Sequence, residues 1–190
     1  MKFTKLKISG LVICEPSVHF DDRGSFYESF RLDHLVEFLG YQISFCQENE
    51  VKSSYGVVRG LHYQQAPYGQ AKLVRVSKGK VLDVAVDIRK GSKTFGKHVS
   101  IVLSAENKKQ FLIPAGFAHG YLALEDDTIF NYKVDNYYNP KYERGIAFDD
   151  SDININWGLD RKELKLSKND VDQPLFVNSE YYNTAHKKYD

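Results

Sequence analysis

The sequence predicts an all-β domain, a barrel or jelly roll of antiparallel strands with a few short helices. Short apolar segments recur through the middle of the 190 residues, and Gly, Asp-Asp and Ser-Lys-Gly turns separate them. Their spacing is roughly the 8–12 residues typical of a sandwich or barrel. Residues 81–88, VLDVAVDI, alternate so that the even-numbered side chains share one face and the odd-numbered side chains share the other. A strand buried on at least one face is therefore expected at the centre of the domain.

Further strands are expected wherever the same pattern returns. They are residues 11–15, 26–30, 57–63, 72–77, 98–103, 110–114, 120–125 and 128–134. One helix is expected at residues 31–40, where Leu32, Leu35, Val36 and Leu39 form a single stripe and Gly40 is a suitable stop. The chain from residue 160 onward is polar and is expected to be partly helical.

The length and composition indicate one domain, residues 1–177, followed by a polar C-terminal tail, residues 178–190. A net charge of +1 indicates no nucleic-acid partner. No stretch approaches the ~20 apolar residues that cross a membrane, and the first residues carry no apolar signal sequence. Cys14 and Cys46 lack the spacing of a zinc site and are expected to be small buried hydrophobes. Together these observations predict a cytoplasmic protein without a membrane partner.

Several strands place polar side chains where a small barrel normally has apolar ones. Asp83 and Asp87 share a face, His62 and His119 lie in two predicted strands, and Tyr132 lies in the middle of another. Each of these residues alone is more often structural than catalytic. Together they favour a barrel that holds a ligand, because such a site needs converging polar groups inside an apolar wall.

The same segments argue against a metal ion. Jelly-roll barrels of the cupin type often bind a metal through a His-x-His pair, a carboxylate and a later His. Here the first motif is His62-x-Gln64, although the later segment keeps Pro114, Gly116 and His119. Two imidazoles and no assured carboxylate fall short of the three protein ligands of a typical catalytic site. We therefore expect no metal and no organic cofactor, with His62 and His119 free for acid–base work.

An ordered series of motifs resembles one family over nearly the whole domain. It runs FDDRGSFYESF (20–30), QEN (47–49), RGLHYQ (59–64), KLVRV (72–76), DVAVDIR (83–89), LSAEN (103–107), IPAGFAHG (113–120), YK (132–133), NYY (136–138) and LSKND (166–170). This series resembles the dTDP-4-dehydrorhamnose 3,5-epimerases of bacterial rhamnose synthesis. The resemblance implies a cupin-type barrel, a homodimer, and a dTDP-linked 4-keto-6-deoxy sugar as substrate.

The resemblance also implies roles for individual residues. His62 corresponds to the proton acceptor, Asp170 to its charged partner, Tyr132 to the proton donor on the opposite face, and Lys72 to the cation beside the 4-keto oxygen. The implied substrate-binding positions are Arg23, Phe26, Glu28, Gln47, Glu48, Asn49, Arg59, Lys72, His119, Tyr138 and Glu143. The chain departs from the family pattern at Glu48, where Asp is usual, and at Asn169, where Lys is common.

These residue types suit the implied reaction. Removing a proton beside a ketone places negative charge on the keto oxygen, so the site needs a base at carbon and a cation or donor at that oxygen. An imidazole, with an ordinary pKa of about 6.5, suits the base, and the Lys72 ammonium suits the oxygen. Inversion needs a proton from the other face, for which the Tyr132 hydroxyl is suitable. Asp170 can reach His62 only if the C-terminal segment folds back over the barrel mouth.

Three other functions remain open from the sequence. An epimerase that inverts only C3 or only C5 of a related sugar would use the same residues. A metal-dependent cupin oxygenase or isomerase is disfavoured by Gln64. A non-catalytic sugar-binding module would not need His62, Lys72, Tyr132 and Asp170 together.

Overall fold

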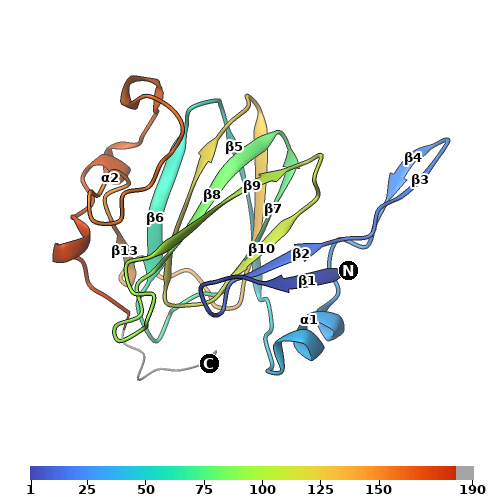
Figure 1. Ribbon diagram of the computed structural model, residues 1–190, viewed down its shortest axis with the longest axis horizontal. Helices are drawn as coiled ribbons and strands as arrows, with labels where there is room; N and C mark the ends of the chain where they lie inside the picture. Colours follow the sequence, from blue (N-terminus) through green and yellow to red (C-terminus); the bar gives the residue numbers. More distant parts are fainter. Residues whose placement is uncertain (183–190) are drawn as a thin grey trace.

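Two antiparallel sheets face each other in the computed structural model, which describes residues 1–182 (Figure 1). The first sheet contains, in order, β1 (Lys2–Lys5), β2 (Val12–Glu15), β10 (Gln110–Ile113), β7 (Lys72–Lys78), β12 (Thr128–Val134) and β5 (Gln47–Ser53). The second contains β13 (Glu143–Gly145), β6 (Val58–Gln64), β11 (Phe117–Ala123), β8 (Lys80–Asp87) and β9 (His98–Ser104). These neighbours run antiparallel, and the predicted all-β jelly roll is confirmed.

The predicted alternation of residues 81–88 sets the two faces of strand β8. Val81 and Ala85 point between the sheets and join a core that includes Phe111 and Phe130. Val84, on the opposite face, packs into a second core outside the sheet. Because both faces of β8 are covered, the strand is mostly apolar, and its two buried aspartates require partners within the protein.

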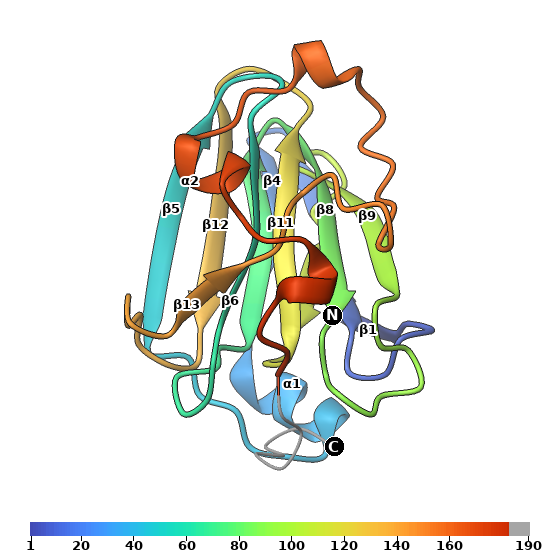
Figure 2. The same ribbon diagram turned by 90° about the vertical axis from the view of Figure 1, so that its left-hand side faces the viewer.

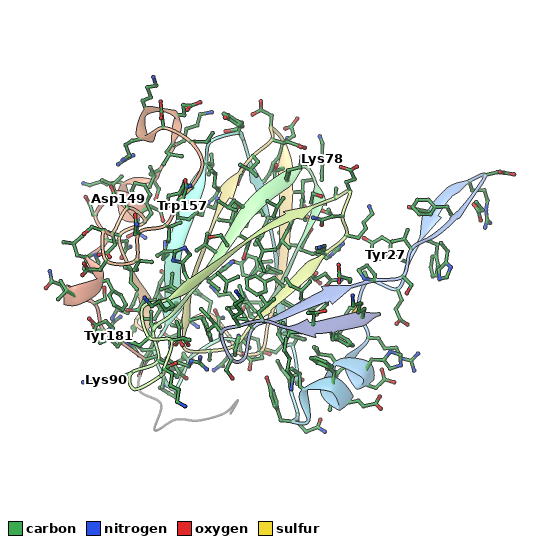
Figure 3. All side chains as sticks on the ribbon, viewed as in Figure 1. Tyr27, Lys78, Lys90, Asp149, Trp157 and Tyr181 are labelled. Carbon is green, nitrogen blue, oxygen red and sulfur yellow. The ribbon has the colours of Figure 1, made fainter. Side chains whose placement is uncertain are left out.

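The second core lies beneath a long C-terminal strap, residues 146–182, which crosses the outer face of the second sheet (Figure 2). Trp157 and Phe176 from the strap are buried there, and Figure 3 shows Trp157 between the strap and the sheet. Backbone hydrogen bonds join Ile146 to Leu61 and Val58 to Lys165. The strap contains η1 (Arg161–Glu163), α2 (Lys168–Val171) and η2 (Phe176–Asn178). The helical character predicted for this region is confirmed.

Packing continues beyond residue 177, where the sequence suggested that the domain ends. The Tyr63 hydroxyl donates to the Glu180 carbonyl at 2.6 Å, and Lys90 N–H donates to the Tyr182 carbonyl at 3.0 Å. Tyr182 is only 8% exposed. Residues 178–182 thus pack on the barrel, while residues 183–190 of the predicted tail lie outside the described part of the chain.

Helix α1 (Leu32–Leu39) confirms the predicted helix and its stop. Gly40 is left-handed at φ +76°, and its N–H donates to the Val36 carbonyl at 2.9 Å. Leu35 packs on the outer face of the first sheet beside Val12 and Leu112. Among residues 1–182, no helix is long and apolar enough to cross a membrane.

Several segments differ from the sequence prediction, and the short strands β1, β13 and His19–Asp21 were not predicted. Residues 26–30 were expected to form a strand, but only Phe26 does so, at the end of β4 (Gly24–Phe26), which pairs with β3 (His19–Asp21). This hairpin projects from the barrel (Figure 1), so residues 27–30 have no neighbouring strand to pair with. Strand β5 was not predicted because its sequence, QENEVKS, is mostly polar and is held by pairing with β12.

A close approach between β6 and β11 shapes the middle of the second sheet. Gly60 has φ +127°, and a Cβ there would lie 2.5 Å from the Gly120 Cα. The pairing passes from His62 opposite His119 to Arg59 opposite Tyr121, so β6 contains an extra residue. Strict alternation would put Arg59 and His62 on opposite faces. The irregularity lets both line the same cavity, as bulges beside functional sites commonly do.

Candidate active site

Two adjoining cavities of about 330 and 240 Å³ are lined by side chains from both sheets. Both are bordered by His62, Lys72 and Tyr132. Of the other predicted residues, Gln47, Asn49, Tyr138 and Glu143 line the first cavity, and Arg59, His119 and Asp170 line the second. Most of the residues that the family resemblance implied therefore surround one polar site.

His62 lies on β6 and meets Asp170 from the strap, which confirms that the C-terminal segment folds back over the barrel. The His62 Nε2 and Asp170 Oδ1 atoms are 2.7 Å apart. The ring nitrogen is buried, and within residues 1–182 it makes no well-aligned hydrogen bond. We therefore regard the contact as a close charge pair, attractive when the imidazole carries its second proton, and not as an aligned hydrogen bond.

The Asp170 carboxylate is held by further donors. Gly60 N–H donates to Oδ1 at 3.2 Å, and the Ser167 hydroxyl donates to Oδ2 at 2.5 Å. Burial alone would raise the pKa of Asp170, but the contacts with His62, Ser167 and Gly60 lower it to about 2. Asp170 therefore remains a carboxylate over the whole working pH range and can stabilise a protonated His62.

Lys72, the first residue of β7, supplies the positive charge. Burial lowers the pKa of its ammonium to about 8, although the negative charges of Asp83 and Glu143 act in the opposite direction. The side chain is therefore mostly protonated at pH 7 in a partly desolvated site. A cation in such a place interacts more strongly with a developing oxyanion than it would in water.

Tyr132 lies on β12, in the sheet opposite that of His62. Burial raises the pKa of its hydroxyl, while the contact with Asn49 on the neighbouring strand lowers it by less. The phenol therefore remains protonated at neutral pH. An acid and a base on opposite walls of one cavity suit a reaction that removes a proton from one face of a carbon and adds one to the other.

His119 is buried on β11 beside an aspartate to which the sequence analysis gave no role. Its Nε2 is 3.0 Å from each carboxylate oxygen of Asp83, and its ring stacks on Phe130. Burial lowers the pKa of His119, although Asp83 opposes this change. Asp83 had been recognised only as an inward-facing polar residue on β8. Its partner His119 lies three strands further along the chain, on the strand that neighbours β8 in the sheet, so the pair is formed by the tertiary fold.

A polar network shapes the first cavity. The Tyr138 hydroxyl donates to Glu143 Oε2 at 2.7 Å, and the Gln47 amide donates to Asn49 Oδ1 at 3.0 Å. Gln64, which stands where a metal-binding cupin has a second histidine, donates to the Tyr68 carbonyl at 2.7 Å and accepts from Asn139 N–H at 2.6 Å. Its amide thus holds the loops around the cavity. Among residues 1–182, no three His, Cys, Asp or Glu side chains gather as a metal site.

Four predicted substrate-binding residues do not reach these cavities within one chain. Glu48 points to the other face of β5, where it pairs with Lys133 at 2.5 Å. Arg23 and Phe26 lie on the projecting hairpin, and Arg23 pairs there with Asp21 at 2.6 Å (Figure 1). Glu28 follows the hairpin and lies 4.0 Å from Arg31.

The fold and the cavity together define a jelly-roll protein with acid–base groups on facing walls. Residues 5–178 match the family described as dTDP-4-dehydrorhamnose 3,5-epimerase. A relative of that name from Shigella flexneri is 48% identical over 182 residues, which cover 96% of this chain and 99% of the relative. The chain belongs to the dTDP-4-dehydrorhamnose 3,5-epimerase family.

Solved structures of the family share the fold. The crystal structure of the dTDP-4-dehydrorhamnose 3,5-epimerase from Elizabethkingia anophelis has a TM-score of 0.92 at 45% identity and covers 95% of this chain and 99% of its own. The Legionella pneumophila dTDP-6-deoxy-D-glucose-3,5-epimerase, solved in complex with dTDP-4-keto-L-rhamnose, has a TM-score of 0.89 at 45% identity, covering 93% of each chain.

Proposed function

We propose that this protein is an isomerase that converts dTDP-4-dehydro-6-deoxy-D-glucose into dTDP-4-dehydro-L-rhamnose, without a metal or organic cofactor. The observation that carries this proposal is the placement of His62 with Asp170 on one wall and of Tyr132 and Lys72, on neighbouring strands, on the facing wall. Its relatives bear the name of this activity, and a structure of the family was solved with the product class bound. The reaction is a step in making dTDP-L-rhamnose for cell-surface carbohydrates.

In the first half of the reaction His62 accepts the proton from the carbon beside the keto group. The electron pair of the broken C–H bond moves onto the keto oxygen and forms an enolate. Lys72 stabilises this charge, because its ammonium lies in the same cavity. The Asp170 carboxylate stabilises the imidazolium that forms on His62. No electrons leave the sugar, so the step requires no redox partner.

In the second half Tyr132 donates its proton to the opposite face of the same carbon. The enolate collapses back to the ketone with inverted configuration, and solvent restores the two side chains to their starting protonation states. C3 and C5 both flank the same carbonyl, so one cation at the oxygen serves both inversions. The two carbons need only be presented in turn between His62 and Tyr132.

The activity itself is tested by incubating the purified protein with dTDP-4-dehydro-6-deoxy-D-glucose in the presence of a chelator and identifying the product by NMR. The proposal predicts accumulation of the L-configured 4-keto sugar. Loss of turnover on chelation, together with stoichiometric iron or manganese in the untreated protein, would contradict the cofactor-free mechanism and favour a metal-dependent cupin.

The rate is expected to fall as pH rises through about 8, because Lys72 then loses the proton that stabilises the enolate. Asp83 raises the pKa of Lys72, so Asp83→Asn should move this alkaline limb to lower pH. The measurement is kcat/KM against pH for both proteins. Deprotonation of Tyr132 does not explain a fall in kcat/KM near pH 8, because burial raises the pKa of its hydroxyl above the ordinary value. If kcat/KM of Asp83→Asn falls at the same alkaline pH as that of wild type, the loss of the Lys72 proton is not the cause of the fall.

We further propose that the protein acts as a homodimer in which the β3–β4 hairpin reaches the cavity of a second copy. The hairpin stands clear of its own barrel, and Phe20 and Phe26 are 80% and 73% exposed on it (Figure 1). Large aromatic groups left in solvent on a projecting hairpin are typical of a surface that is covered in an assembly. Arg23 would then contribute a guanidinium to the diphosphate of the partner's substrate.

Light scattering should give twice the mass of the chain. A mixing experiment tests the shared site directly: Arg23→Ala and His62→Ala should each have low turnover, whereas refolding the two together should restore part of it. In a mixed dimer, the cavity of the Arg23→Ala copy keeps its own His62 and receives the hairpin with Arg23 from the His62→Ala copy. One of the two sites therefore has both wild-type residues, and part of the turnover should return. A monomeric mass, or no gain on mixing, would contradict the proposal.

We also propose a cytoplasmic location. Cys14 is buried as predicted, whereas Cys46 is exposed and the prediction for it was wrong. Both are free thiols, which supports a reducing compartment.

A further inference from the structure

Ser167 holds the Asp170 carboxylate in the orientation that faces His62. Its hydroxyl donates to Asp170 Oδ2 at 2.5 Å, while Oδ1 accepts from Gly60 N–H and lies 2.7 Å from His62 Nε2. Each carboxylate oxygen therefore has its own donors, and the plane of the group is determined by contacts on both sides.

The burial of Asp170 makes this contact important. Its side chain is only 6% exposed, and Ser167 is the donor to Oδ2 among the hydrogen bonds of residues 1–182. A buried carboxylate oxygen that loses its donor is costly, so the group is expected to rotate or to seek water. Either movement would take Oδ1 away from the imidazole. Both Ser167 and Asp170 line the second cavity, so such a change would occur at the site itself.

We propose that Ser167 is a positioning residue for epimerisation, acting through Asp170 on the base His62. This inference deepens the proposed function and rests on it. The hydroxyl fixes the carboxylate, and the carboxylate is then placed to stabilise the imidazolium that forms on His62 during proton transfer. This series of contacts joins the strap to the barrel, because Ser167 and Asp170 come from the strap, whereas Gly60 and His62 come from β6.

Ser167 has a second, purely structural task from which this role must be separated. It is the N-cap of α2, where its oxygen accepts from Asp170 N–H at 3.1 Å. Glycine is nearly as good an N-cap as serine but has no hydroxyl, whereas threonine can cap the helix and keeps the hydroxyl. Ser167→Gly therefore removes the bond to Asp170 with little loss of capping, and Ser167→Thr retains both functions.

The test compares steady-state kinetics of wild type, Ser167→Gly and Ser167→Thr on the nucleotide sugar. We expect kcat of Ser167→Gly to fall about 10-fold or more with KM changed less than about threefold, because a misplaced catalytic group affects the transition state more than binding. Ser167→Thr should recover most of the lost kcat. A matched control is Ser92→Gly, which removes a similar 2.6 Å bond from a hydroxyl to the buried Asp87, away from the cavities. Its kcat should not change.

The outcomes separate this inference from the proposed function. Wild-type kcat in Ser167→Gly, or an equal loss in Ser167→Thr and Ser167→Gly, would overturn the positioning role while leaving the epimerase activity intact. A fall in kcat that is matched by a fall in melting temperature and by the same effect in Ser92→Gly would show a structural role only. Absence of turnover in the wild-type protein would instead refute the proposed function.

Discussion

His62→Ala is expected to lower kcat by about 10²- to 10⁴-fold, the usual contribution of a positioned general base. The imidazole lies against Asp170 at 2.7 Å and borders both cavities, so its loss removes the group that accepts the proton. Binding of dTDP should remain within about threefold of wild type, because His62 is not among the groups assigned to the nucleotide. Calorimetry and steady-state kinetics on the same preparation provide the two measurements.

Solvent exchange sharpens this prediction. In deuterated water the His62→Ala protein should introduce no deuterium at C3 or C5, because neither proton can be removed. His34→Ala is a suitable control, since the half-buried His34 lies on helix α1 and lines neither cavity, so this variant should exchange as wild type does. Near-normal turnover in His62→Ala would mean that another residue is the base.

Tyr132→Phe should lower the rate of inversion by about 10²- to 10⁴-fold while leaving proton removal active. His62 would still take the proton and Lys72 would still stabilise the enolate. Without the phenol on the opposite wall, however, the group placed to return a proton to this carbon is the imidazolium that formed on the first wall. Deuterium from solvent should therefore enter the sugar with retention of configuration, which NMR distinguishes from inversion.

Tyr121→Phe is the matched control for Tyr132→Phe. Tyr121 also borders the second cavity, but its hydroxyl lies 3.0 Å from the Ser53 hydroxyl, and its ring stacks on Phe130. This variant should retain inversion. Inversion at the wild-type rate in Tyr132→Phe, or equal losses in both variants, would show that Tyr132 is not the specific proton donor.

The sequence predicted the fold best where burial determines residue type. The alternation of residues 81–88 identified the two faces of β8, and the helical stripe with its glycine stop identified α1. It failed where pairing, and not burial, determines structure. Strand β5 is polar and is defined by its pairing with β12, whereas the aromatic segment 26–30 has no neighbouring strand beyond Phe26.

For the site, the family resemblance named the central residues, but physical reasoning from the sequence could not have assembled them. Alternation predicts Arg59 and His62 on opposite faces, and only the irregularity at Gly60 brings both to one cavity. Asp170 depends on the strap crossing the sheet. The sequence contained one indication of the position of Ser167, because a serine three residues before an aspartate is a common helix-capping arrangement.

One measurement tests the central claim most directly. The wild-type protein is incubated with dTDP-4-dehydro-6-deoxy-D-glucose in deuterated water without added metal, and C3 and C5 are followed by NMR. The account predicts deuterium at both carbons, each with inverted configuration. Exchange and inversion at only one carbon would contradict the double epimerisation, and no exchange at either carbon would contradict the proposed activity altogether.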